Sequence, residues 1–176
     1  MRSQGRDVIR ATIDDFLFPR AQRYPRGVYS AESCYFDTHD QDALKSVLLD
    51  PLGPGGDRRF QYAVYGHTAD TAMSPPVTTA PADYVLVFDG VFLMRPELID
   101  RWDLRIFVST ALEKTRGSCR DLQRQVGICG RSPAALARAL RPLPTVLLAT
   151  VHPTDHTNII VHKRRAQQPV WETRTH

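Results

Sequence analysis

The chain has 176 residues, of which 42% are hydrophobic and 24% charged, and its formal net charge is +4 at pH 7. This length suits one domain, and the apolar share is enough for a packed core, which excludes a disordered chain. The longest apolar run, around Val85 to Met94, is interrupted by Asp89 and is too short to span a bilayer. The basic start lacks the apolar segment of a secretory signal, so we expect a soluble, cytoplasmic protein.

The positive charge is compatible with two kinds of partner, because arginines contact both nucleic acids and the phosphates of small nucleotides. The candidate positions for a nucleic-acid interface are Arg116, Arg120, Arg124 and the basic run 162–165. No aromatic residues alternate with them, which makes a nucleic-acid interface the weaker hypothesis. The three cysteines follow no metal-ligand spacing, so we expect reduced thiols.

The first predicted element is a buried strand at 7–13, which is rich in β-branched residues. It ends in the acidic pair Asp14 and Asp15. The following residues, 16–35, contain many Pro, Arg and Tyr residues and indicate a loop. Arginine and aromatic side chains on such a loop could clamp a planar ligand or pack the loop onto the core, and the sequence leaves both open.

The middle of the chain predicts a short amphipathic helix at 40–49 with acidic residues at its start. A Gly- and Pro-rich turn is expected at 50–57 and a strand or hairpin arm at 59–65. A Pro/Thr loop follows at 72–82. The apolar run 83–88 predicts a central parallel strand that is covered on both faces.

After Asp89, the pattern predicts a further series of alternating elements. These are a short helix at 96–102, a buried strand at 104–108, helices at 113–126 and 132–140, and a last strand at 158–161. We expect a single domain over 1–162 and a loose polar tail over 163–176.

This alternation favours an α/β fold with a mainly parallel sheet flanked by helices. In such folds, ligands bind beyond the carboxyl ends of the strands. Asp14, Asp15 and Asp89 all follow predicted strands. We therefore expect these three carboxylates to gather in one cleft.

Several segments resemble the uridine kinases and their close bacterial relatives in the P-loop kinase superfamily. They are IDDFLFPR (13–20), CYFDTHDQDAL (34–44), DPLGPGGDRRF (50–60), VLVFDGVFLMRPEL (85–98) and WDLRIFV (102–108). Together they extend from about residue 5 to residue 121 in the order of the family. The resemblance implies a P-loop kinase-like sheet and ATP-dependent phosphorylation of the 5′-hydroxyl of uridine or cytidine.

The resemblance also implies roles for single residues. Asp14 matches the carboxylate that accepts the proton from the nucleoside 5′-hydroxyl, and Asp37 matches the acid that holds the ribose hydroxyls. Phe36, beside Asp37, and Tyr65, which matches an aromatic residue next to the base, are further substrate-binding candidates. Asp89 falls where the family keeps an acid near Mg²⁺.

On the phosphate side, Arg120 resembles the lid-helix arginine that neutralises developing phosphate charge, and Arg116 lies one turn before it. The cofactors implied are Mg²⁺ and ATP. The partner implied is a small nucleoside, uridine or cytidine, and not a membrane; a nucleic acid is the less favoured partner. The oligomeric state stays open.

One family motif is missing from this sequence. The lysines are Lys45, Lys114 and Lys163, and none follows a glycine, so there is no G-x-x-x-x-G-K-[S/T] motif. We expect the family's first strand, phosphate-binding loop and first helix to be lacking, and ATP binding and catalysis to be impaired. The alternative is a non-catalytic relative that binds a nucleoside or a protein.

Overall fold

The computed structural model describes residues 5–27, 30–109, 153–162 and 170–174. It divides the chain into two compact units, Met1–Leu93 and Met94–His176. Each unit contains a parallel strand pair, so the fold is α/β, as the sequence predicted. None of the described helices is long and apolar enough to cross a membrane.

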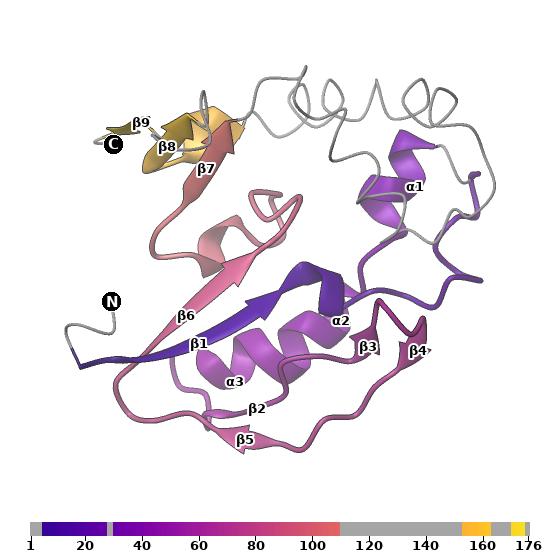
Figure 1. The fold of residues 1–176 in the computed structure, drawn as a ribbon, viewed down its shortest axis with the longest axis horizontal. Coiled ribbons are helices and arrows are strands. Elements are labelled where there is room, and N and C mark those ends of the chain that lie inside the picture. Colours follow the sequence, from indigo (N-terminus) through magenta and orange to yellow (C-terminus); the bar gives the residue numbers. More distant parts are fainter. Residues whose placement is uncertain (1–4, 28–29, 110–152, 163–169, 175–176) are drawn as a thin grey trace. The chain divides into compact units, whose positions relative to one another are not determined.

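The first unit is built on two parallel strands, β1 (Asp7–Thr12) and β6 (Tyr84–Asp89). They lie side by side in Figure 1, and their register pairs Asp7 with Tyr84 and Thr12 with Asp89. The strand predicted at 7–13 is thus confirmed to within one residue. The next residues, Ile13–Asp15, form a single 3-10 turn at the carboxyl end of β1.

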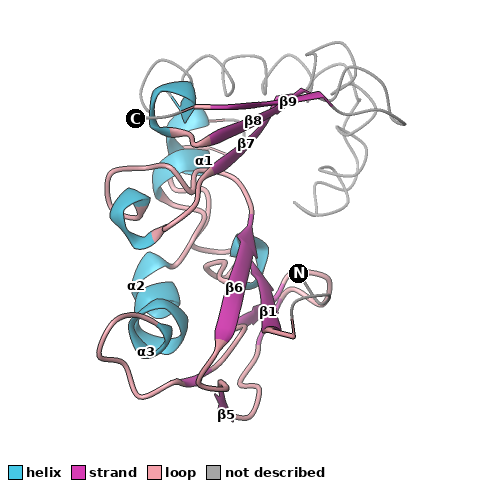
Figure 2. Cartoon of the chain, turned by 90° about the vertical axis from the view of Figure 1, so that its left-hand side faces the viewer, coloured by secondary structure: helices cyan, strands magenta, loops and turns pink. Residues whose placement is uncertain are grey.

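The predicted amphipathic helix is present and extends further than expected. It runs as α2 (Gln41–Leu44), a π-helical turn (Lys45–Leu49) and α3 (Asp50–Leu52), and Figure 2 shows it beside the strand pair. The expected turn at 50–57 therefore begins only after Leu52.

The reason for this extension is a compensated proline. Pro51 has no N–H to donate to the carbonyl of Val47, but the backbone N–H of Gln61 donates to that oxygen instead, at 2.9 Å. The π-helical turn is closed by the N–H of Asp50 donating to the carbonyl of Lys45.

The predicted loop at 16–35 also contains a helix, α1 (Ala31–Phe36). Ser30 caps its start, because the Ser30 hydroxyl accepts a hydrogen bond from the N–H of Ser33 at 3.2 Å. This helix was missed at the sequence level because the many Pro and Arg residues before Ser30 indicated a loop.

Four two-residue strands complete the first unit. β2 (Arg59–Phe60) pairs with β5 (Thr78–Thr79), and β3 (Tyr65–Gly66) pairs with β4 (Thr71–Ala72), both antiparallel. The arm predicted at 59–65 is thus two short strands, and the loop predicted at 72–82 contains β5.

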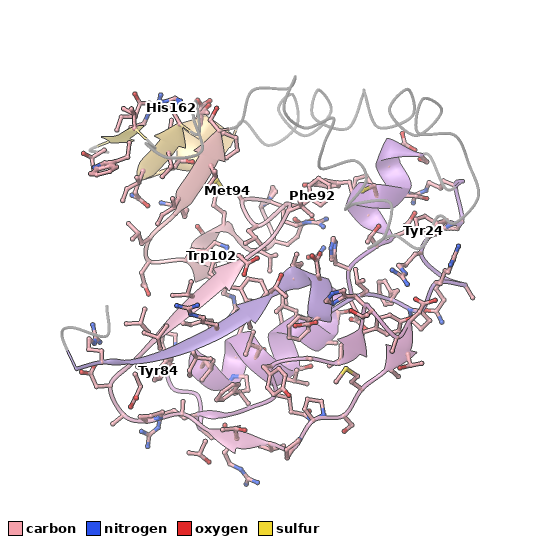
Figure 3. All side chains as sticks on the ribbon, in the orientation of Figure 1. Tyr24, Tyr84, Phe92, Met94, Trp102 and His162 are labelled. Atoms are coloured by element: carbon pink, nitrogen blue, oxygen red, sulfur yellow. The ribbon has the colours of Figure 1, made fainter. Side chains whose placement is uncertain are left out.

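The core of this unit lies between the strand pair and the helical layer. Phe16, Leu44 and Leu48 are fully buried, and the Phe16 ring contacts Phe88 of β6 with 6.2 Å between ring centroids. Burial of each such side chain contributes about 1.5–3 kcal/mol relative to exposure. The hydroxyl of Tyr84, labelled in Figure 3, donates to the carbonyl of Leu52 and joins the helix end to β6.

The second unit contains a three-stranded sheet in the order β7 (Ile106–Ser109), β8 (Ile159–His162) and β9 (Val170–Thr173). β7 and β8 are parallel, and β9 is antiparallel to β8. The strand predicted at 158–161 is confirmed. The loose tail expected over 163–176 is wrong for Val170–Thr173, because these residues complete a hydrogen-bonded ladder with β8.

Short 3-10 turns flank this sheet at Ile99–Arg101 and Pro153–His156. The first of them stands where a short helix was predicted at 96–102. The helices predicted at 113–126 and 132–140 lie outside the described residues.

Two predicted strands are more exposed than expected. Val87 on β6 is 41% exposed, and Ile106 and Val108 on β7 are 49% and 54% exposed. Within the described part of the chain, β6 pairs with β1 alone and β7 with β8 alone. The expectation of a central strand covered on both faces is therefore wrong for β6 in this part of the structure.

Candidate functional site

The two parallel strands of the first unit bring three carboxylates together. Asp89 ends β6 directly opposite Thr12, and Asp14 and Asp15 follow Thr12 in the 3-10 turn. The turn is capped by the Thr12 hydroxyl, which accepts a hydrogen bond from the N–H of Asp14 at 3.5 Å. Because both strands run in the same direction, their carboxyl ends meet at one edge, as expected from the sequence.

The surroundings of Asp14 favour its protonated form. Burial raises the pKa of this carboxyl above 3.8, the charge of His67 lowers it, and the negative charges of Asp89 and Asp15 raise it further. A carboxyl whose pKa is raised binds a proton more tightly than an exposed one. Such a group at a strand end is a candidate general base.

His67 is a member of this cluster that the sequence gave no reason to select. Its Nδ1 lies 3.2 Å from Oδ1 of Asp15, and both side chains are partly buried. The two residues are 52 positions apart. A lone histidine in a turn matches no motif, so only the tertiary structure identifies it.

Gly90 allows the chain to leave β6 over this cluster. Its φ is +149°, and a Cβ added there would lie 2.1 Å from Cγ2 of Ile13. Any other residue would therefore meet both backbone strain and a steric clash. This requirement gives a physical reason for the Asp-Gly pair that ends the strand.

Asp37 lies at the carboxyl end of α1, on a segment that runs beside the carboxylate turn. The N–H of Phe18 donates to the carbonyl of Thr38 at 3.0 Å, and the N–H of Asp40 donates to the carbonyl of Phe16 at 2.7 Å. These backbone bonds fix the residues after Asp15 against the residues after Asp37.

The Asp37 carboxylate accepts a hydrogen bond from the hydroxyl of Ser33 at 3.0 Å and lies 3.5 Å from Nη1 of Arg26. Phe36 is 54% exposed, and the guanidinium of Arg26 lies over its ring, 5.6 Å from the centroid. The segment between β1 and α2 thus supplies an arginine, Arg26, and an aromatic ring, Phe36, next to an acceptor carboxylate.

The loop after β6 packs onto the same region. Phe92, labelled in Figure 3, contacts Tyr35 edge-on with 5.2 Å between ring centroids and His39 with 6.3 Å. Phe92 adopts a left-handed backbone, with φ of +60°. These ring contacts hold the segment after Asp89 against the α1 segment that carries Asp37.

Tyr65 is buried in this structure and does not present its ring to a ligand. Its side chain is 3% exposed, its ring is covered by the guanidinium of Arg23 at 5.3 Å, and its hydroxyl donates to Asp70 Oδ1 at 2.6 Å. Burial and the contact with Asp70 raise the pKa of Tyr65, so its hydroxyl stays a donor. Packing against a base stays a prediction for this residue.

Three further residues from the sequence analysis remain, the two arginines Arg116 and Arg120 and the cysteine Cys34. Arg116 and Arg120 lie outside the described residues. Cys34 is described, and burial raises the pKa of its thiol to about 11, which keeps it protonated and unreactive at neutral pH.

Among the described residues, no group of three or more His, Cys, Asp or Glu side chains is arranged to hold a metal ion. Mg²⁺ bound through substrate phosphates needs only one or two carboxylates, since it keeps several water ligands. Asp89 is exposed and close enough to Asp14 for its negative charge to raise the pKa of Asp14, so its oxygen donors fit such an ion.

Comparison with known proteins supports the fold. No model of a known protein family matches the chain, and no curated protein matches it. The structure is similar to that of a possible uridine kinase from Bacillus stearothermophilus, with 20% sequence identity and a TM-score of 0.63. The match covers 90% of this chain and 74% of that one. This chain therefore has a uridine-kinase-like α/β fold, as the resemblance implied.

Proposed function

We propose that this chain is a uridine-kinase-like protein that binds a pyrimidine nucleoside, with Asp14 as the base that accepts the proton of the 5′-hydroxyl. The observation that carries the proposal is the half-buried Asp14 carboxyl at the carboxyl end of β1, close to Asp15, Asp89 and His67. The fold shared with a possible uridine kinase supports the same proposal.

The chemistry assigned to Asp14 follows from its surroundings. A nucleoside hydroxyl is a weak nucleophile until a positioned base takes its proton in the transition state. The raised pKa of Asp14 gives the carboxylate a greater proton affinity than an exposed aspartate has. Two further acidic residues beside it, Asp15 and Asp89, make proton uptake more favourable.

The ribose is assigned to the Asp37 region. A carboxylate accepts hydrogen bonds from two neighbouring hydroxyls, and Asp37 is held for this by Ser33 and Arg26. Phe36 and Arg26 present an exposed flat surface next to it, which suits a planar base.

On the donor side, Mg²⁺ would neutralise charge on the phosphates of ATP when bound, and Asp89 would supply an oxygen ligand. Arg116 and Arg120 are proposed to contact the phosphates.

A second candidate is nucleoside binding without turnover. It is favoured by the sequence observation that no lysine of these 176 residues follows a glycine. Without a phosphate-binding loop, ATP would lose the amide and lysine contacts on which phosphoryl transfer depends. A non-catalytic relative that binds a protein through the same unit belongs to this second candidate.

The test is titration calorimetry of the 176-residue chain with uridine and, separately, with Mg-ATP, followed by an assay for uridine monophosphate. Binding of both ligands with product formation supports the kinase. Uridine binding alone supports the second candidate. If uridine does not bind, both nucleoside proposals are wrong.

A site variant sharpens this measurement. Asp37→Asn removes the charge that would hold the ribose hydroxyls, and we expect uridine affinity to fall roughly 10- to 100-fold, the range for a hydrogen bond to a charged group. Asp83→Asn is the matched control, since Asp83 forms an exposed ion pair with Arg6 before the start of β6. An unchanged affinity in Asp37→Asn would contradict the assignment of Asp37.

A further inference from the structure

The short hairpin β3–β4 delivers His67 to the carboxylate cluster. β3 and β4 pair Tyr65 with Ala72 and Gly66 with Thr71, so His67 begins the connection between them. Its imidazole contacts Asp15, and the backbone N–H of Val64 donates to the carbonyl of Asp15 at 3.0 Å. With only two residues in each strand, this hairpin is too short to be stable through its own ladder.

A polar cluster around the buried Arg23 fixes the other end of the hairpin. Arg23, on the loop after β1, is 3% exposed and forms an ion pair with the Asp70 carboxylate. The Tyr65 hydroxyl donates to the same Asp70 oxygen at 2.6 Å, and the Arg23 guanidinium covers the Tyr65 ring. We name these three residues, Arg23, Tyr65 and Asp70, the hairpin lock.

The geometry of the lock indicates that it fixes the position of the β3–β4 hairpin. Asp70 adopts a left-handed backbone with φ of +53°, a conformation that a non-glycine residue keeps only when its surroundings hold it. The Nε of Arg23 is buried with no hydrogen-bond partner in the described part of the chain. The Arg23 side chain is 4% exposed, whereas the Asp70 side chain is 41% exposed. Removal of Asp70 would leave the buried Arg23 charge without its ion-pair partner, which is costly.

We propose that Arg23, Tyr65 and Asp70 are positioning residues, which hold the β3–β4 hairpin so that His67 stays against Asp15 beside Asp14. In the part of the chain that the structure describes, no hydrogen bond or ion pair joins the lock to Asp14 or Asp15, so the lock acts through His67. The role of His67 in the nucleoside site rests on the proposed function, whereas the mechanical link from lock to histidine does not.

The test of the mechanical link is ¹⁵N NMR of the His67 ring in the full chain, recorded in alkaline solution. Because the Asp15 carboxylate can only accept, Nδ1 must carry the proton while the contact with Asp15 persists. Free neutral imidazole prefers the proton on Nε2. We therefore expect the Nδ1–H signal in the wild type and a shift toward Nε2–H in Asp70→Ala.

Two further variants keep the test decisive. Asp70→Ala leaves the Arg23 charge buried without its partner and can unfold the protein, which circular dichroism would show. Tyr65→Phe keeps the ring under Arg23 and removes only the hydroxyl, and we expect the same shift to a smaller extent. Asp70→Asn retains an acceptor oxygen and should restore most of the Nδ1–H signal. Asp83→Ala, which removes an exposed ion pair, is the control and should change nothing.

An unchanged His67 tautomer in folded Asp70→Ala, or in Tyr65→Phe if Asp70→Ala does not fold, would overturn the proposal. A second measurement, uridine affinity in Asp70→Ala, His67→Ala and the double variant, tests the link to the site. We expect the lock variant to weaken binding by roughly tenfold in the wild-type background and to have little further effect without His67, as for coupled residues. If the wild type binds no uridine, the proposed function fails while the NMR result still decides the lock.

Discussion

Burial raises the pKa of Asp14, the charge of His67 lowers it, and the negative charges of Asp89 and Asp15 raise it. Asp89 ends β6, and Asp15 follows Asp14 in the 3-10 turn. Burial and the two carboxylates make the ionised form of Asp14 less stable in the folded protein, and together they outweigh the effect of His67. The residue that best fits a general base is thus also one that lowers the stability of the fold at neutral pH.

Asp14→Asn keeps the size of the side chain and removes its charge. We expect the variant to lose any phosphorylation activity, to keep uridine binding and to gain stability of about 1 kcal/mol at neutral pH, in the range of single stabilising changes. The pKa of Asp14 is raised in the folded state, so its contribution to stability is present below 3.8 and is lost as pH rises through the raised pKa.

The stability advantage of Asp14→Asn over the wild type should therefore grow with pH across this range. Urea denaturation of both proteins at several pH values measures it. A variant that is less stable than the wild type at neutral pH would show that the Asp14 charge stabilises the fold.

Gly90 offers a second prediction at the level of one residue. Gly90→Ala adds a methyl group at 2.1 Å from the Ile13 side chain, at a backbone φ of +149°. We expect a loss of about 2–4 kcal/mol in the free energy of unfolding, from strain and overpacking together. Denaturant titration followed by circular dichroism measures this loss.

The matched control for Gly90 is Gly55→Ala. Gly55 has φ of +78° but no atom within 4 Å of an added Cβ. Only the backbone cost of about 1–2 kcal/mol is expected there. Equal losses at the two positions would mean that the contact with Ile13 relaxes without cost.

At the scale of elements, the helical segment 41–52 is stabilised both by a neighbouring residue and by one that is distant in the chain. Its start is set locally, because the Asp40 carboxylate accepts a hydrogen bond from the N–H of Ala43 at 2.9 Å. Its continuation through Pro51 depends on Gln61, which supplies the hydrogen bond to Val47 that proline cannot make. The start was therefore predictable from the sequence and the end was not.

Asp40→Ala tests the cap of this segment. We expect it to lower the free energy of unfolding by about 1 kcal/mol, because the helix loses a side-chain acceptor for its first N–H groups. Asp42→Ala is the matched control: Asp42 is an exposed acidic residue in the same first turn, and its loss should cost only a few tenths of a kcal/mol through the helix dipole. Thermal unfolding measures the stability of both variants. Equal losses would mean that Asp40 acts only through its charge and not through its hydrogen bond to Ala43.

At the scale of the whole molecule, the chain divides into two units that each contain a parallel strand pair. The carboxylate cluster, Asp37, Phe36 and the hairpin lock all belong to the first unit, Met1–Leu93. The second unit contributes a three-stranded sheet whose last strand, β9, lies in a segment where polar composition suggested a loose tail. A strand of this length is stabilised by pairing with another strand, here β8, and composition alone does not reveal that pairing.

The sequence by itself determined the α/β class, the positions of β1, β6 and β8, and the gathering of Asp14, Asp15 and Asp89. The reason is that apolar runs and the acids that end them are local signals, and parallel strands place such acids at one edge. Only the tertiary structure decided the contact of His67 with Asp15, the burial of Tyr65 beneath Arg23 and the exposure of one face of β7. These features depend on contacts between residues far apart in the chain, which no local sequence pattern encodes. The same holds for the space left by Gly90 and for the hydrogen bond from Gln61 to Val47.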